Sequence, residues 1–216
     1  NKDGSVGEIT DEIYLKGLGS VAERNFRPHV NCVNITPDQK YLCAVDLGVD
    51  QVKIYKFNYE TGKITLVDML RCEQESAPRI IKFSPDGRFA YLICELKNYI
   101  SVYSYKDGPR GPIFELVQTI STLNDYHSKG SAACVLRFSR DWNYVLCSNA
   151  GDNSIGIFKV DHETGMLEKI CILPISGDYP KAADFFPDNR HIMALNHESN
   201  TMTIFHINYE KKYFSL

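Results

Sequence analysis

One six-residue block occurs four times in this chain of 216 residues. The third residue of every copy is an aspartate, and successive aspartates lie 48, 55 and 47 residues apart. Twelve residues after each aspartate stands another acid or amide, at Asp50, Asn98, Asn153 and Asn200. The copies themselves are Thr36–Tyr41, Ser84–Phe89, Ser139–Tyr144 and Phe186–His191. A constant offset inside such a repeat predicts one structural unit used four times.

Each repeat has the pattern of four short β-strands. In the first repeat an apolar run precedes the block, Tyr41–Val45 follows it, and Val52–Phe57 and Ile64–Leu70 come next. Apolar residues at every second position indicate half-buried strands, and Pro-Asp-Gly or a related sequence favours a tight turn. The remaining expected strands include Val30–Ile35, Ile80–Phe83, Phe89–Cys94, Tyr144–Cys147, Ile155–Val160, Leu167–Leu173 and Ile192–Leu195.

Four short strands in about 48 residues are typical of a β-propeller blade, so we expect an all-β propeller built from antiparallel four-stranded sheets. A β-sandwich would not explain the fixed offsets. We predict one partial propeller domain over 1–216, with the outer strand of a preceding blade within 1–26, at Glu12–Leu15. The blades are expected at 27–75, 76–125, 126–175 and 176–216.

The chain begins and ends at equivalent points of this repeat, which leaves three arrangements open. Four blades could close on themselves, the chain could be a slice of a larger ring, or two copies could complete one ring. An open slice would expose apolar sheet faces at both ends, and such faces favour self-association.

Composition argues against several partners. The net charge is −3 and the basic residues are scattered singly, whereas a nucleic-acid surface is normally basic. No apolar stretch approaches the roughly 20 residues of a membrane helix, and residues 1–4 lack the apolar core of a signal peptide. The seven cysteines are odd in number and form no C-x-x-C pair, which favours buried thiols over disulfides or a metal site. We therefore expect a cytoplasmic protein without metal or cofactor.

Arg79 and Glu95 form the clearest candidate site. Arg79 lies eight residues before Gly87 and Glu95 lies eight residues after it. An antiparallel hairpin turning at Gly87 would make the two residues cross-strand neighbours, facing the central channel from the innermost strand. A guanidinium binds carboxylates or phosphates, and a carboxylate activates water. A simple ion pair that holds the hairpin together is the alternative.

Several segments resemble the seven-bladed lactonase family, which includes bacterial propeller-type 6-phosphogluconolactonases and the fungal carboxymuconate lactonizing enzyme. The matching segments are Arg27-Pro28-His29, Val45–Asp50, Pro78-Arg79 through Glu95, Leu146–Asn149 and Asn196–Asn200. The resemblance implies that the chain covers about four of seven blades. It also implies hydrolysis of a sugar or organic-acid lactone, an anionic small molecule, without a cofactor.

The resemblance places catalysis at Arg79 and Glu95, with His29 as an acid, a base or an anion donor. It implies substrate contacts from Lys181, His197, Asn31 and Asp46. His29 could equally be a loop histidine bonded to backbone. Asp46 and Asp50 could bind calcium, although aspartates in such turns usually cap backbone N–H groups.

This chain departs from the family pattern at several positions equivalent to Arg79 and Glu95. Asn31 stands where the family often has a histidine, and Ala150 where it often has an arginine. Lys181 replaces an arginine and His197 a glutamine. Because lysine cannot reproduce the guanidinium fork, these changes leave a second interpretation open, in which the propeller has lost catalysis and binds a ligand or a protein.

Overall fold

The computed structural model describes residues 3–20, 25–127, 129–209 and 213–215, and four antiparallel four-stranded sheets make up most of it. In each sheet four consecutive strands lie in chain order. The first sheet contains β1 (Val30–Ile35), β2 (Tyr41–Asp46), β3 (Gln51–Phe57) and β4 (Ile64–Arg71). The second contains β5 (Pro78–Phe83), β6 (Phe89–Cys94), β7 (Tyr99–Gly108) and β8 (Gly111–Ser121). The third contains β9 (Ala133–Phe138), β10 (Tyr144–Asn149), β11 (Ser154–Val160) and β12 (Leu167–Pro174). The fourth contains β13 (Pro180–Phe185), β14 (His191–Asn196), β15 (Thr201–Asn208) and β16 (Tyr213–Ser215).

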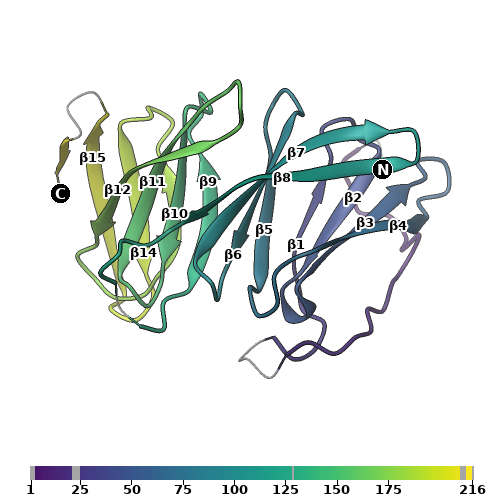
Figure 1. Cartoon of the computed structure of the whole chain (residues 1–216), viewed down its shortest axis with the longest axis horizontal. Coiled ribbons are helices and arrows are strands. Elements are labelled where there is room, and N and C mark those ends of the chain that lie inside the picture. Colours follow the sequence, from purple (N-terminus) through teal and green to yellow (C-terminus); the bar gives the residue numbers. More distant parts are fainter. Residues whose placement is uncertain (1–2, 21–24, 128, 210–212, 216) are drawn as a thin grey trace.

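The sheets follow one another in an arc, as the colours from purple to yellow show in Figure 1. The first strands of successive sheets contact each other, β1 with β5, β5 with β9 and β9 with β13, so they form the inner edge. The first and the fourth sheet lie at opposite ends of the arc, which excludes a closed ring of four (Figure 1). This architecture confirms the predicted all-β, partial propeller.

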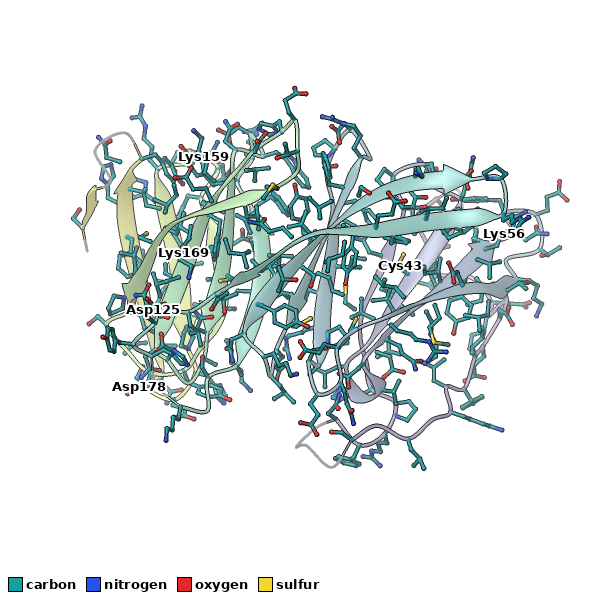
Figure 2. All side chains as sticks on the ribbon, in the orientation of Figure 1. Cys43, Lys56, Asp125, Lys159, Lys169 and Asp178 are labelled. Atoms are coloured by element: carbon teal, nitrogen blue, oxygen red, sulfur yellow. The ribbon has the colours of Figure 1, made fainter. Side chains whose placement is uncertain are left out.

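Hydrophobic side chains fill the space between each pair of neighbouring sheets. Three separate core clusters lie between the first and second, the second and third, and the third and fourth sheets. Cys43, for example, is fully buried between the first two sheets, whereas Lys56 points outward (Figure 2). Because each sheet contributes to the cluster on either side, burial of apolar area ties the blades into one domain.

The repeated block is the turn between the first two strands of each sheet. In the second sheet the Ser84 hydroxyl donates to Asp86 Oδ1 at 2.6 Å, and Asp86 Oδ1 accepts the Arg88 N–H at 3.0 Å. The same serine or threonine bond forms at the Asp38 and Asp141 turns. The residue that follows the aspartate of each turn has a left-handed backbone, which suits the glycine or asparagine found in two of the four sheets. These residues are Gln39, Gly87, Trp142 and Asn189.

Three of the four residues twelve positions later link their sheet to the next one, at Asp50, Asn98 and Asn153. Asp50, Asn98, Asn153 and Asn200 all have left-handed backbones, with φ between 51° and 53°. Asp50 accepts hydrogen bonds from the backbone N–H groups of Glu75 and Ala77, both at 2.8 Å, in the loop that enters the second sheet. Asn153 accepts the Tyr179 N–H at 2.8 Å in the same way. The constant offset thus marks the connection between blades.

A bulge occurs at the same point of each first strand. Pro78 pairs with Cys94 and Ile80 with Ile93, which leaves Arg79 between them without a cross-strand partner. The predicted direct opposition of Arg79 and Glu95 is therefore replaced by a bulge, because the strand carries one residue more than its partner. The same register shift occurs at Asn31, Cys134 and Lys181.

Residues 3–20 differ from their expected structure. The segment Glu12–Leu15 was expected to be the outer strand of a preceding blade, and no strand is assigned within residues 3–20. Asp11 Oδ2 instead accepts the Ile64 N–H at 2.8 Å, and Thr10 donates its hydroxyl to the Gly62 carbonyl at 3.1 Å. These two side-chain bonds attach the segment to the turn before β4. They do not make it a strand, because a strand requires a continuous ladder of backbone hydrogen bonds.

All seven cysteines are free thiols. Burial raises the pKa of Cys43, Cys94 and Cys147 to about 12 each. These three thiols therefore behave as small apolar side chains rather than as nucleophiles. No helix in the described part of the chain is long and apolar enough to cross a membrane.

We expect Asp50→Ala to destabilise the protein by about 2–4 kcal/mol, because the buried Ala77 N–H and its neighbours lose their acceptor. Urea denaturation of the complete protein measures this loss. Asp68→Ala is the control, since Asp68 is exposed and accepts only the adjacent Met69 N–H among the described residues. Equal stability of the two variants would show that Asp50 does not hold the sheets together.

Candidate functional site

Arg79 and Glu95 form an ion pair at the inner edge of the second sheet, between Arg79 Nη1 and Glu95 Oε2. The bulge turns Arg79 out of the ladder between β5 and β6, and Glu95 directly follows β6. The Glu95 N–H donates to the Ala77 carbonyl at 2.8 Å, which fixes the backbone on both sides of the pair. The strand ends and the bulge together position these two charges.

The pair also reaches the neighbouring blade. Arg79 Nε donates to the Cys134 carbonyl in β9 at 2.8 Å, so the guanidinium spans two inner strands. Glu95 is buried with 1% exposure, whereas the Arg79 side chain is 20% exposed. The expectation that both groups face an open channel thus fits only Arg79. Arg79 Nη2 has no hydrogen-bond partner among the described residues and is available to an anion.

The four bulges place equivalent residues in corresponding positions along the inner edge. In each sheet the residue following the second strand donates its N–H to the carbonyl two residues before the bulge residue. These bonds are Leu47 to His29, Glu95 to Ala77, Ala150 to Ala132 and His197 to Tyr179, at 2.8–3.0 Å. The sequence offsets therefore identified structurally equivalent positions, with Asn31, Arg79, Cys134 and Lys181 at the bulges.

The fourth sheet offers a second cationic position. Lys181 and His197 are both exposed at the start of β13 and just after β14. Lys181 Nζ lies 5.3 Å from the centre of the Tyr179 ring, and the rings of Tyr179 and His197 are 6.5 Å apart. This group combines an ammonium with an imidazole and an aromatic face, and all three are accessible to a solute.

His29 lies at the rim of the first sheet. Its side chain is exposed and borders an open hollow together with Leu15, Phe26, Arg27 and Pro28. The guanidinium of Arg27 lies 5.5 Å from the centre of the Phe26 ring. Arg27 is a further cation on this face that the sequence did not single out, although it is part of the Arg-Pro-His segment.

Asp46 has a structural role in this arrangement. It is completely buried, its Oδ1 accepts the His29 N–H at 2.7 Å, and its Oδ2 lies 3.0 Å from Lys53 Nζ. Asp46 also caps the short 3-10 helix η1 (Leu47–Val49) by accepting the Gly48 N–H. These contacts favour a structural role over the predicted substrate contact: Asp46 fixes the backbone of His29. Lys53, its buried partner, was not identified from the sequence.

The third sheet contributes little chemistry at this edge. Cys134 is buried at the bulge, and Ala150, at the position equivalent to Glu95, has no exposed surface. Asn31 is half-buried on β1.

No cluster of three or more His, Cys, Asp or Glu side chains suited to a metal occurs among the described residues. Asp50, the suggested calcium ligand, accepts N–H donors instead, which indicates capping.

Among the described residues, Arg79 and Glu95 are the predicted catalytic groups in direct contact, while Arg27 and His29 lie beside the first sheet and Lys181 and His197 lie in the fourth. Arg79, Lys181 and Arg27 offer positive charge for an anionic substituent, and Glu95 offers a carboxylate beside the guanidinium. His29 and His197 supply imidazoles at the same ends of the sheets. A carboxylate, imidazoles and cations are the groups that general acid–base hydrolysis of an ester-like bond requires.

Comparisons with known proteins agree with this geometry. A family model described as a seven-bladed β-propeller lactonase matches residues 1–214. An uncharacterized Lactococcus lactis protein is 36% identical over 204 residues, which cover 94% of this chain and 58% of the relative. The 6-phosphogluconolactonase of Bacillus subtilis is 28% identical, with 94% of this chain and 57% of the enzyme covered.

Solved structures show the same likeness. A putative 6-phosphogluconolactonase from Bacteroides fragilis superimposes with a TM-score of 0.85 at 28% identity, covering 100% of this chain and 61% of that one. The periplasmic gluconolactonase of Pseudomonas aeruginosa gives 0.84 at 27% identity, covering 94% and 56%. The chain thus spans less than two thirds of these proteins. The repeat, the inner-edge site and the match over residues 1–214 show that the chain belongs to the seven-bladed β-propeller lactonase family.

Proposed function

We propose that this chain supplies four of the seven blades of a propeller that hydrolyses the lactone of a sugar acid or another organic acid. The observation that carries the proposal is the ion pair of Arg79 with the buried Glu95 at an inner-strand bulge, in a member of this family. Exposed apolar residues on the two end sheets, Val33 on β1 and Met202 on β15, support packing against further blades or a second copy.

Glu95 is the proposed general base. It takes a proton from a water molecule as the water oxygen adds to the lactone carbonyl carbon. The ring C–O bond then breaks, and the leaving oxygen receives a proton, which gives the open hydroxy acid. Arg79 holds the Glu95 carboxyl group in place, because the guanidinium contacts one of its oxygens and is itself anchored to the Cys134 carbonyl.

The other predicted residues serve binding and proton transfer in this proposal. Arg79 Nη2 and Lys181 bind the anionic group of the substrate, and Asn31 contributes an amide. His29 or His197 stabilises the oxyanion or protonates the leaving oxygen. The names of the Bacillus subtilis and Bacteroides fragilis proteins make 6-phosphogluconolactone the first lactone to test. We place the reaction in the cytoplasm, where the free thiols would stay reduced.

A second candidate function is a non-catalytic propeller that binds a ligand or a protein. The buried Ala150 and Cys134 favour it, because two of the inner-edge positions carry no group that contacts a polar substrate. The same fold hosts many unrelated functions, so hydrolysis of a lactone panel by the complete protein distinguishes the two. Absence of hydrolysis with all lactones, in a correctly folded complete protein, would favour the binding function.

We expect Glu95→Gln to lower kcat for 6-phosphogluconolactone by about 10²–10⁴-fold, the usual contribution of a general base. The amide keeps the volume and an acceptor for Arg79, so the thermal midpoint should remain close to that of the parent. Glu73→Gln is the control, because Glu73 is an exposed acid paired with Lys97. Unchanged turnover in Glu95→Gln would remove this residue from the mechanism.

Lys181→Ala tests the anion contact. Because Lys181 is exposed, we expect its loss to raise KM for 6-phosphogluconolactone about two- to fivefold and to leave kcat nearly unchanged. KM for the unphosphorylated gluconolactone should change less. Lys97→Ala, an exposed lysine at the end of the second sheet, serves as the matched control. Equal effects of both substitutions on KM would contradict a role for Lys181 in substrate binding.

A further inference from the structure

A separate pocket lies between the second and third sheets, at the opposite end of β5 from Arg79. Arg79 stands at the start of that strand, and the Ser84 turn that borders the pocket follows its end. The cavity measures about 210 Å³. The residues that carry the inference below are Phe89, Tyr91, Phe138, Asp141, Trp142 and His162. The pocket is therefore distinct from the proposed lactonase site.

Aromatic rings form one wall of this pocket. Trp142 stacks on Phe138 with ring centres 4.3 Å apart and planes 29° apart, and Tyr91 meets Phe138 edge-on at 5.0 Å. Trp142 has φ of 61°, a left-handed backbone that bulky residues rarely adopt. The equivalent turn residues of the other three sheets, Gln39, Gly87 and Asn189, have left-handed backbones as well. The repeated turn imposes this backbone in every sheet, so the aromatic side chain is what distinguishes the third sheet at this position.

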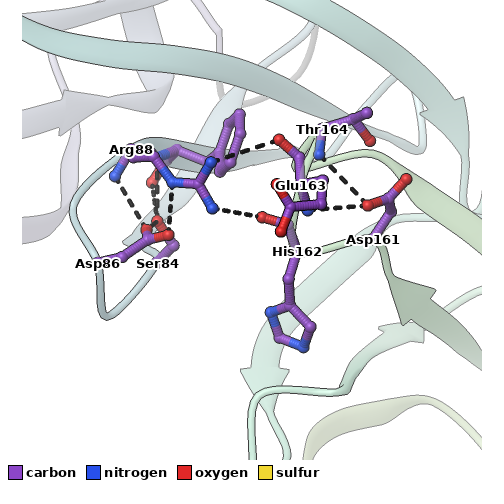
Figure 3. A network of polar contacts seen from close by, with 8 residues as sticks. Ser84, Asp86, Arg88, Asp161, His162, Glu163 and Thr164 are labelled. Atoms are coloured by element: carbon purple, nitrogen blue, oxygen red, sulfur yellow. Dashed lines mark hydrogen bonds and ion pairs between the residues drawn. The ribbon is translucent and has the colours of Figure 1, made fainter.

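The rim of the pocket is held by an arginine network. Arg88 Nε donates to Asp86 Oδ2 at 2.7 Å, and Arg88 Nη2 donates to the His162 carbonyl at 2.6 Å (Figure 3). These bonds connect the turn of the second sheet to the turn between β11 and β12. Two consequences follow: the two sides of the pocket are fixed relative to each other, and the charge of Asp86 is balanced by Arg88.

Asp141 is the acid that remains for a ligand. It lines the pocket and has no ion pair among the described residues. Its Oδ1 accepts the Ser139 hydroxyl at 2.6 Å and the Asn143 backbone N–H at 3.2 Å, whereas its Oδ2 accepts Asn143 Nδ2 alone, at 2.8 Å. Oδ2 therefore keeps acceptor capacity for a ligand.

Tyr91 provides a second polar group in the same cavity. The residue is 1% exposed and lines the pocket, and its hydroxyl makes no hydrogen bond to any residue that the structure describes. A ligand with a hydrogen-bonding group in this pocket would give the hydroxyl a partner.

We propose that this pocket binds a small organic cation, an ammonium group carried on an aromatic or short aliphatic body. The ammonium donates hydrogen bonds to Asp141 and to the Tyr91 hydroxyl, and the organic body packs on Phe138 and Trp142. Indole and phenol rings attract cations through their faces, and a desolvated ammonium gains most from such contacts. The limited volume and the concave shape favour a small molecule.

Titration calorimetry of the complete protein with benzylammonium chloride tests the proposal. We expect saturable binding, at least about tenfold weaker binding of benzyl alcohol, and a loss of about tenfold in affinity in Asp141→Asn. Asp38→Asn is the matched control, since Asp38 occupies the same turn position in the first sheet and should leave binding unchanged. Absence of saturable binding, equal binding of the alcohol, or an unchanged affinity in Asp141→Asn would each overturn the proposal.

Trp142→Asn distinguishes ligand binding from simple packing. Asparagine tolerates the left-handed turn, so we expect the thermal midpoint to stay within a few degrees of the parent while benzylammonium binding is lost. Unchanged binding in this variant would show that the tryptophan only packs on Phe138, and the proposal would fail. If the variant does not fold, Tyr91→Phe is the second test. It keeps the ring and removes the hydroxyl, so we expect measurably weaker benzylammonium binding, and unchanged binding would contradict the proposal.

Discussion

The link from each sheet to the next depends on the left-handed residue between the second and third strands. Asp50 turns the chain there, and its carboxylate accepts N–H groups from the loop that enters the second sheet. Its own carbonyl accepts the Cys72 N–H at the end of β4. One residue thus joins the turn, the outer strand and the next blade. Because the burial of apolar side chains has no preferred direction, such directed bonds set how the sheets are placed relative to one another.

The bulges at the inner edge convert this regular scaffold into a site. A residue in a bulge is released from the ladder, so Arg79 bonds both to Glu95 and to the carbonyl of Cys134 in the next sheet. The same backbone feature carries Asn31 and Lys181 in other sheets. Each sheet therefore has a bulge residue at the same backbone position, and the side chain at that position differs between sheets. Differences in substrate between relatives of this fold would then arise from a few bulge residues, while the sheets stay the same.

Much of the fold was readable from the sequence because propeller blades follow local rules. Alternating apolar residues and Pro-Asp turns predicted strands such as Phe89–Cys94 with their observed bounds. The proximity of Arg79 and Glu95 was also predictable, since it depends on one hairpin. Three features were not: the bulge, the burial of Glu95 and the pairing of Asp46 with Lys53. They depend on an extra residue in one strand and on neighbouring sheets, which a pattern within one repeat does not contain.

The distribution of buried thiols has a practical consequence for following how this molecule opens. Cys43, Cys94 and Cys147 lie on the second strands of three successive sheets, and each is almost completely inaccessible with a strongly raised pKa. An alkylating reagent reaches such a sulfur only after its own sheet has separated from a neighbour. The labelling rates of Cys43 and Cys94 therefore both report separation of the first and second sheets, and the labelling rate of Cys147 reports separation of the second and third.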